Sequence, residues 1–352
     1  PGVSLAYRIS EESFWKNNGI NDIINNLKIR GSWGKTGNDL ISPYQFYSLY
    51  ELNFLAFVTG DQVYHQTYSE SHAGNTKAQW EEANQINAGI DISFLNNKIT
   101  LTADYFNNLR TKILITQTAS IPGMTGLTYI LPDINLGKVR NQGFDFEVNY
   151  NDKIGKFDYK VGLNGCYAKN KVLFFDEAEG FLPWQTQTGH PMYSGLYYEA
   201  IGIFHTSDDL ALYPHLAEAR AGDIIFKDVN LDGEITGDDM TRIYKNVVPT
   251  FTGGLNITCD YKGIDFSIMF QGQAGAVRYL QGLGGKGVSN YLKSFYDNRW
   301  TESNAYSSYP RTYNRNDEYW VSSVNPNTFW LRKTDFVRLK NMELGYTLPT
   351  AW

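Results

Sequence analysis

The stretch that decides the fold runs from Gly222 to Gly272 and reads GDIIFKDVNLDGEITGDDMTRIYKNVVPTFTGGLNITCDYKGIDFSIMFQG. It holds an acidic loop and then two runs of alternating residues, joined by a tight turn at Tyr261-Lys262-Gly263. The first run has a polar phase and a mostly apolar phase, the latter made of Phe251, Gly253, Leu255, Ile257, Cys259 and Tyr261. Alternation with a period of two predicts β-strands with one apolar and one polar face. The medium that meets the apolar face therefore decides the class of protein.

The same alternation recurs along the whole chain and predicts about nine strands. It is clearest in a hairpin whose turn is Leu95-Asn96-Asn97-Lys98, where Asn tolerates left-handed φ at low cost. In the last strand the phase slips near Asn341, which predicts a β-bulge. The expected strands cover residues 3–9, 27–34, 86–94, 99–105, 144–150, 157–167, 251–261, 264–271 and 335–349.

The connections between these strands alternate between short and long. Transmembrane β-barrels have short turns at one end and long loops at the other. In a soluble β-sandwich, nothing requires the short turns to lie at one end and the long loops at the other. We therefore predict an all-β fold, a transmembrane antiparallel β-barrel segment with long extracellular loops. The rival interpretation is a secreted, soluble β-rich protein that binds or degrades glycans and carries a dockerin-like calcium loop.

Composition agrees with a barrel and argues against other partners. The chain holds 25 Tyr, 20 Phe and 8 Trp, yet its net charge of −6 offers no basic face for a nucleic acid. Of its two cysteines, Cys166 shares the polar phase of its strand and Cys259 the apolar phase of its own, so we expect two free thiols. The chain starts at Pro1 without an initiator Met, and we interpret it as a segment of a longer protein.

Several motifs carry a family resemblance. They are LKIRGSWGKTGN at 27–38, AQWEEANQINAGIDISFLNNKITLTADYF at 78–106, GKVRNQGFDFEV at 137–148, GHPMYSGLYYEAIGIF at 189–204, GDIIFKDVNLDGEITGDD at 222–239, the PTFTGGLNITCDYKGIDFSIMFQGQAG run at 249–275, RWTESNA followed by YPR at 299–311 and FVRLKNMELGYTLP at 336–349. In this order they resemble the C-terminal half of SusC/RagA-type TonB-dependent outer-membrane transporters of Bacteroidetes. The resemblance covers nearly the whole chain.

The resemblance implies a barrel of roughly 22 strands closed by an N-terminal plug. Residues 1–352 would then be part of a single barrel domain, with the signal peptide, the plug and the final strands outside this sequence. It further implies import of oligosaccharides or peptides, with a SusD-like surface lipoprotein as a lid and TonB supplying energy through a region outside this sequence. Between the two cargoes we expect a glycan first and a peptide second.

No motif in the chain predicts an enzyme. The five histidines show no metal-binding spacing, and the sequence has no GxSxG and no P-loop. Paired glycosidase carboxylates would have to face each other across a cleft. Six strand carboxylates lie instead in polar phases and are expected to line a wet lumen: Asp91, Asp104, Asp145, Glu147, Asp260 and Asp265.

The acidic loop DVNLDGEITGDD has the spacing of a calcium loop. With Asp228 as position one, Asn230 stands at three, Asp232 at five, Gly233 at six, Glu234 at seven and Asp239 at twelve. Ca²⁺ takes six to eight oxygen ligands, and we expect a structural Ca²⁺ held by Asp228, Asn230, Asp232, Glu234 and Asp239. Asp239 departs from the Glu of an EF-hand, as in dockerin-like loops. The alternative is an Asx turn without an ion.

Aromatic residues crowd the long connections. They can stack on sugar rings, pack against the lipoprotein lid or form a girdle at the membrane interface, so no single one is predicted to bind substrate. The set is Tyr44, Phe46, Tyr47, Tyr50, Trp184, Tyr193, Tyr197, Tyr198, Tyr279, Tyr306, Tyr309, Tyr313, Tyr319, Trp320 and Trp330.

Overall fold

The structure is a computed structural model that describes residues 1–58, 60, 64–117, 119–121, 123–127, 130–178, 180–280, 293–312 and 325–348. The chain divides into two compact units. The wall unit comprises Pro1–Gly180, Thr250–Gln273 and Phe336–Trp352, and the loop unit comprises Phe181–Pro249 and Ala274–Asp335.

The wall unit is a nine-stranded antiparallel sheet in which every strand pairs with the next wall strand along the chain. Within the described residues its edges, β1 and β17, each pair on one side only. The all-β fold and the count of nine strands are confirmed. The strands are β1 (Gly2–Arg8), β2 (Ile24–Asn38), β5 (Glu81–Phe94), β6 (Ile99–Ile115), β7 (Ile134–Ile154), β8 (Phe157–Phe174), β13 (Phe251–Tyr261), β14 (Ile264–Ala274) and β17 (Phe336–Tyr346).

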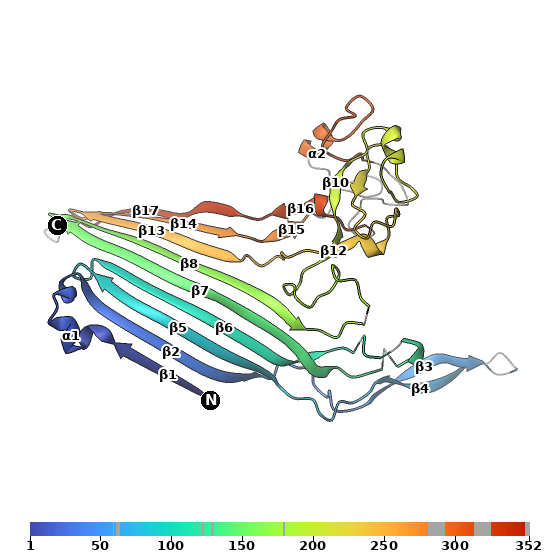
Figure 1. Cartoon of the computed structure of the whole chain (residues 1–352), viewed down its shortest axis with the longest axis horizontal. Coiled ribbons are helices and arrows are strands. Elements are labelled where there is room, and N and C mark those ends of the chain that lie inside the picture. The colour runs from blue at the N-terminus through green and yellow to red at the C-terminus, as the bar shows by residue number, and fades with distance from the viewer. Residues whose placement is uncertain are drawn as a thin grey trace. The chain divides into compact units, whose positions relative to one another are not determined.

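Short turns gather at one end of this sheet, the turn end (Figure 1). The predicted left-handed turn is confirmed, because Leu95, Asn96 and Asn97 have φ of 52°, 56° and 64°. Lys262 and Gly263 have φ of 51° and 84°, as a two-residue type I′ hairpin requires. The β1–β2 connection is longer and holds η1 (Ile9–Glu11), α1 (Ser13–Lys16) and η2 (Ile20–Asp22).

The long connections leave the opposite end, the loop end. In the wall unit they hold β3 (Leu49–Val58), β4 (Tyr64–His72) and η3 (Gly123–Thr125). The hairpin β3–β4 corrects the sequence analysis, which gave residues 36–77 no strand. β3 is mostly apolar and β4 mostly polar, so neither carries the alternation that indicates a strand with two different faces, and the register of the hairpin shifts twice.

The predicted bulge in the last strand is also confirmed. Met269 pairs with Asn341 and Phe270 with Leu339, so Lys340 is the extra residue of β17. The bulge restores the phase, and the apolar residues of β17 on both sides of it oppose apolar residues of β14.

One face of the sheet, the apolar face, carries exposed large side chains in the predicted phase, including Ile29, Trp33, Ile86, Leu163 and Ile264. Near the loop end the pairing register aligns a row of aromatic residues across four strands: Tyr105, Phe144, Tyr167 and Phe251. A second row near the turn end contains Phe157, Tyr261 and Tyr346.

The separation of the two aromatic rows matches a bilayer. On β8 they are ten residues apart, from Phe157 to Tyr167, and on β13 also ten, from Phe251 to Tyr261. At about 3.3 Å per residue and a tilt of about 40°, ten residues rise about 25 Å, the height of the apolar band of outer-membrane barrels. The apolar face between the rows therefore fits the hydrocarbon layer.

The loop unit has a hydrophobic core of its own, built from six buried residues: Tyr198, Ile224, Phe226, Ile235, Phe295 and Trp330. Its elements are short: β9 (Leu196–Tyr198), β10 (Ala200–Ile203), η4 (Ser207–Ala211), β11 (Ile224–Phe226), η5 (Gly237–Asp239), β12 (Met240–Arg242), β15 (Val277–Tyr279), α2 (Lys293–Asn298), η6 (Thr328–Trp330) and β16 (Leu331–Lys333). The strands form three two-stranded sheets, β9–β12, β10–β11 and β15–β16.

Candidate functional site

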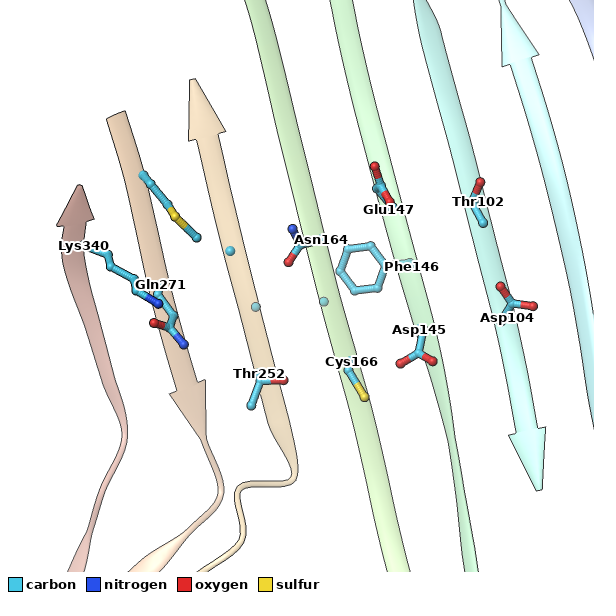
Figure 2. A pocket seen from close by; sticks show the side chains of 14 residues that line it. Thr102, Asp104, Asp145, Phe146, Glu147, Asn164, Cys166, Thr252, Gln271 and Lys340 are labelled. Carbon is cyan, nitrogen blue, oxygen red and sulfur yellow. The ribbon is translucent and has the colours of Figure 1, made fainter. Parts of the chain in front are cut away.

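The candidate functional site is the polar face of the wall, where a pocket crosses six strands (Figure 2). Asp104, Asp145, Glu147, Gln271 and Lys340 are among its lining residues. All the lining carboxylates come from the predicted polar phases, and their place on one common face of the sheet is confirmed.

Strand register brings the polar side chains into rows. Asp104 lies opposite Asp145, Asp145 opposite Cys166, and Cys166 opposite Thr252. Figure 2 shows Asp145 and Cys166 side by side on neighbouring strands. A second row sets Thr102 opposite Glu147. The period of two thus converts four separate strand sequences into one continuous polar surface.

One end of this surface is held by an ion-pair cluster. The Arg30 guanidinium donates from Nη2 to Asp104 Oδ2 at 2.5 Å and from Nε to Asp91 Oδ2 at 3.3 Å. Lys28 Nζ lies 3.8 Å from the same Asp91 carboxylate. Gly89 makes room for the cluster, because a Cβ there would lie 2.4 Å from an Asp104 oxygen and 2.8 Å from Arg30 Cζ.

Further along the surface, negative charge is not neutralised. Within the described residues Asp145 and Glu147 form no ion pair, and Glu147 accepts a hydrogen bond from Asn149 Nδ2 at 2.7 Å. Lys340, raised by the bulge, enters the pocket from β17 (Figure 2). The lining of the pocket therefore offers carboxylates, amides, hydroxyls and one ammonium group to a polar solute.

The same geometry argues against a pair of catalytic carboxylates. Asp104 and Asp145 are cross-strand neighbours on one surface of a sheet, whereas glycosidase carboxylates flank the bond they cleave. The arrangement supports reversible hydrogen bonding to a polar solute.

In the acidic loop, side-chain oxygens bind the loop's own backbone. Asp228 accepts hydrogen bonds from the amides of Leu231 (2.6 Å) and Gly233 (2.9 Å). Asp239 is fully buried and accepts from the amides of Val229 and Thr236, both at 2.8 Å. The sharp turn expected at Gly233 is present, with φ of 87°.

The middle of the acidic loop faces solvent. Asn230 donates to Asp232 at 2.7 Å, Asp232 accepts from the Glu234 amide at 2.9 Å, and Glu234 is exposed. Across the described residues, no group of three or more His, Cys, Asp or Glu side chains is placed to hold a metal ion. The loop has the hydrogen bonding of the ion-free alternative, so binding Ca²⁺ would require Asn230 and Asp232 to turn inward. Calcium binding stays a prediction.

The aromatic residues of the long connections fall into two groups. Tyr198 and Trp330 lie in the core of the loop unit, and Tyr309 packs against it. Tyr197 and Tyr279 stack on each other at 5.7 Å, and burial raises the pKa of Tyr279 to about 12. The exposed members include Tyr44, Phe46, Tyr47, Tyr50, Tyr193 and Tyr306. Tyr313, Tyr319 and Trp320 lie outside the described residues.

An open sheet with an apolar band about 25 Å high on one face and a charged, polar pocket on the other defines a class of protein, the wall of a transmembrane β-barrel. A family model described as "TonB dependent receptor-like, beta-barrel" matches residues 1–352. The chain belongs to this family, and its place is the outer membrane.

Curated relatives and solved structures agree with this assignment. TonB-dependent receptor P3 of Formosa agariphila is 28% identical over 100% of this chain and 35% of its own length. TonB-dependent receptor SusC of Bacteroides thetaiotaomicron is 25% identical over 100% of this chain and 34% of its own. The structure of the RagAB peptide transporter covers 99% of this chain with a TM-score of 0.74 at 22% identity, over 37% of that chain.

The chain spans about a third of the length of these relatives (35% and 34%). Among the described residues, no helix is both long and apolar enough to cross a membrane. Sequence reasoning had missed the Arg30 cluster and the core of the loop unit. The cluster did have a sequence signal, because Lys28 and Arg30 alternate in a predicted polar phase. If β2 is assumed to pair with β5, this phase lies opposite that of Asp91.

Proposed function

We propose that the chain forms part of the wall of a TonB-dependent importer that moves oligosaccharides across the outer membrane, with peptides as the alternative cargo. The observation that carries this proposal is the pocket-bearing polar face, which lies behind an apolar face of bilayer height. Family membership supplies the second support, because the matching relatives are named TonB-dependent receptors.

In this function, the polar face keeps the cargo hydrated and lets it move along the wall. Carboxylates and amides in register rows can exchange hydrogen bonds with sugar hydroxyls or peptide groups one after another. TonB, acting through a region outside this sequence, supplies the energy. No residue of the wall then needs to act as nucleophile or general acid.

The proposed partner is a SusD-like surface lipoprotein that closes over the extracellular loops. Exposed aromatic residues in the loop unit support this partnership, with Tyr193 77% and Tyr306 83% exposed. Exposed aromatic residues are enriched at protein interfaces and can stack on sugar rings. The relative RagAB is named as a peptide transporter, and that cargo is a property of RagAB.

Growth tests decide the proposal. A strain lacking the full-length gene is grown on single purified polysaccharides and on protein digests, and then complemented with wild type, with D145N/E147Q and with the control T258A. Thr258 shares the polar phase but lies nearer the turn end. We expect loss of growth on one polymer class, rescue by wild type and T258A, and weaker rescue by D145N/E147Q at equal protein level. Unaltered growth of the deletion strain on every substrate would refute import.

Calcium binding by Asp228, Asn230, Asp232, Glu234 and Asp239 is a separate proposal, supported by the loop spacing and by the hard oxygen donors. Extracellular calcium modules bind with Kd of about 10⁻⁴–10⁻³ M. Calorimetric titration of the full-length protein should show a site of this strength that D232A removes and D208N, in the same loop unit, retains. Heat of binding that is identical in wild type and D232A would refute it.

A further inference from the structure

A patch of basic residues lies on the apolar face, beyond the aromatic row at the loop end. Lys138 and Arg140 share the phase of Phe144 on β7, and Lys169 and Lys171 share the phase of Tyr167 on β8. Register pairs Arg140 with Lys171, and Lys138, two residues from Arg140 along β7, pairs with Phe174 just past a register shift. We call these four residues the basic patch.

The level of the basic patch is that of lipid headgroups. Lys169 and Lys171 stand two and four residues beyond Tyr167, the aromatic residue of the same strand. With about 3.3 Å per residue and a tilt of about 40°, they lie about 5 and 10 Å above the aromatic row. In a barrel the loop end is extracellular, so this level belongs to the outer leaflet.

The four charges lack anionic partners within the part of the chain that the structure describes. Lys169 Nζ lies over the Tyr167 ring, 5.3 Å from its centre, and this contact supplies no negative charge. Arg140 Nε is buried and has no hydrogen-bond partner. On the same face, by contrast, Glu82 neutralises Lys35 at 2.7 Å and Lys112 at 2.8 Å. An unpaired buried guanidinium donor costs free energy unless a ligand accepts its hydrogen bond.

A hollow in the apolar face lies at the depth of acyl chains. Its floor is Gly253 and Gly272, and its walls include Leu163, Phe270 and Val337. Gly253 pairs with Gly165, which is four residues, or about 13 Å, along β8 from Lys169. A Cβ at Gly253 would lie 3.0 Å from the Asn164 carbonyl and 3.1 Å from the Phe251 ring, so glycine keeps this hollow open.

We propose that this region binds an anionic, phosphate-bearing lipid of the outer leaflet. Its phosphate accepts hydrogen bonds from Arg140 and from the ammonium groups of Lys169 and Lys171, and one acyl chain fills the hollow at Gly253 and Gly272. The coincidence of unpaired cations at headgroup level with an apolar hollow below them favours a lipid over a free anion. A bound lipid of this kind would fix the depth of the wall in the membrane.

The test uses the full-length transporter in neutral detergent and native mass spectrometry. The probes are phosphatidic acid and phosphatidylcholine with the same acyl chains, and inorganic phosphate. We expect phosphatidic acid to bind and phosphatidylcholine to bind at least tenfold more weakly. The variant R140Q/K169Q/K171Q should lose about a hundredfold in affinity, because each surface cation contributes about fivefold toward an anionic lipid.

Two controls separate the site from general charge and from folding. K153Q/K160Q/K262Q removes the same number of charges elsewhere on the wall and should retain binding. K169R/K171R keeps the charge and should also retain it. V337W narrows the hollow from a wall residue that is 80% exposed, so it should weaken binding of phosphatidic acid without changing heat-resistant migration of the folded barrel.

Several results would overturn the proposal. Equal binding of the two lipids would exclude recognition of an anionic headgroup, and unchanged affinity in R140Q/K169Q/K171Q would exclude the basic patch. If inorganic phosphate, at the same concentration as the lipid, displaced phosphatidic acid, the basic patch would be a site for a free anion. Loss of lipid binding when the lipoprotein partner is added would assign it to a protein interface. Each readout is independent of cargo uptake, so failure of the proposed import would leave this inference standing.

Discussion

Replacing Ile257 by arginine is the sharpest test of the membrane wall. Ile257 belongs to the apolar phase of β13 and pairs with Val161 on β8. It lies six residues from Phe251 and four from Tyr261, close to the midpoint between the two aromatic rows. Arginine at the midplane of a lipid-facing strand costs about 2–4 kcal/mol. At about 1.4 kcal/mol per factor of ten, the unfolding equilibrium should shift about 30- to 700-fold.

Two variants on the same hairpin serve as controls. Asn256 is adjacent to Ile257 and points to the polar face, so N256R should change stability by less than about 0.5 kcal/mol, as for an ordinary surface change. Ile264 starts β14 in the row of Tyr346, so I264R lies near the interface and should cost about 0–1 kcal/mol. Asp91 is unsuitable as a control, because its replacement would also remove the ion pairs with Arg30 and Lys28.

The assay is guanidinium unfolding of the full-length protein in phospholipid vesicles, followed by tryptophan fluorescence. Gel migration with and without heating reports the folded fraction independently. The expected order of destabilisation is I257R, then I264R, then N256R. Equal losses for I257R and N256R would refute the assignment of one face to lipid, and with it the barrel.

Three further outcomes are expected. R30M should lower the free energy of unfolding by about 1 kcal/mol, because Asp91 and Asp104 lose a partly exposed partner, and adding D104N should recover part of the loss in the same unfolding assay. Alkylation of the unreduced, unfolded protein should label both Cys166 and Cys259 in peptide mass spectra; a disulfide-linked peptide would contradict this. Burial raises the pKa of Tyr279 to about 12 in the folded protein, above its unfolded value near 10, so its contribution to stability is present below pH 10 and is lost as pH rises toward 12. When stability is followed by fluorescence over this pH range, Y279F should lose less stability than wild type. An unchanged slope of stability against pH would contradict this prediction.

The sequence predicted the strand segments that lie in the bilayer, but it did not predict how far the strands extend beyond the bilayer. On β7 the predicted strand covered residues 144–150, and the structure extends it to Ile134–Ile154. Beyond Phe144 the outward phase carries Gln142, Arg140 and Lys138, so apolar alternation disappears while the hydrogen-bond ladder continues. The hydropathy pattern of a strand reflects the medium that each of its faces meets. The hydrogen bonds between neighbouring strands form whether that medium is lipid or water.

Of the candidate site and the loop unit, the sequence likewise predicted one part and not the other. The polar phases of Asp104, Asp145 and Glu147 were readable because period two assigns each to a face. The loop core was not, because Tyr198, Phe295 and Trp330 come from two connections separated by the hairpin β13–β14. No local pattern reports which distant segments will share a core.

The separate core of the loop unit has a consequence for how this protein can change over time. An insertion in Phe181–Pro249 or Ala274–Asp335 leaves all cross-strand pairs of the wall in place. An insertion of one residue inside β13 would turn every later side chain of that strand to the opposite face, unless a bulge such as that at Lys340 absorbed it. Mutation can therefore reshape the loop unit in large steps, while the wall accepts change mainly by substitution within a phase.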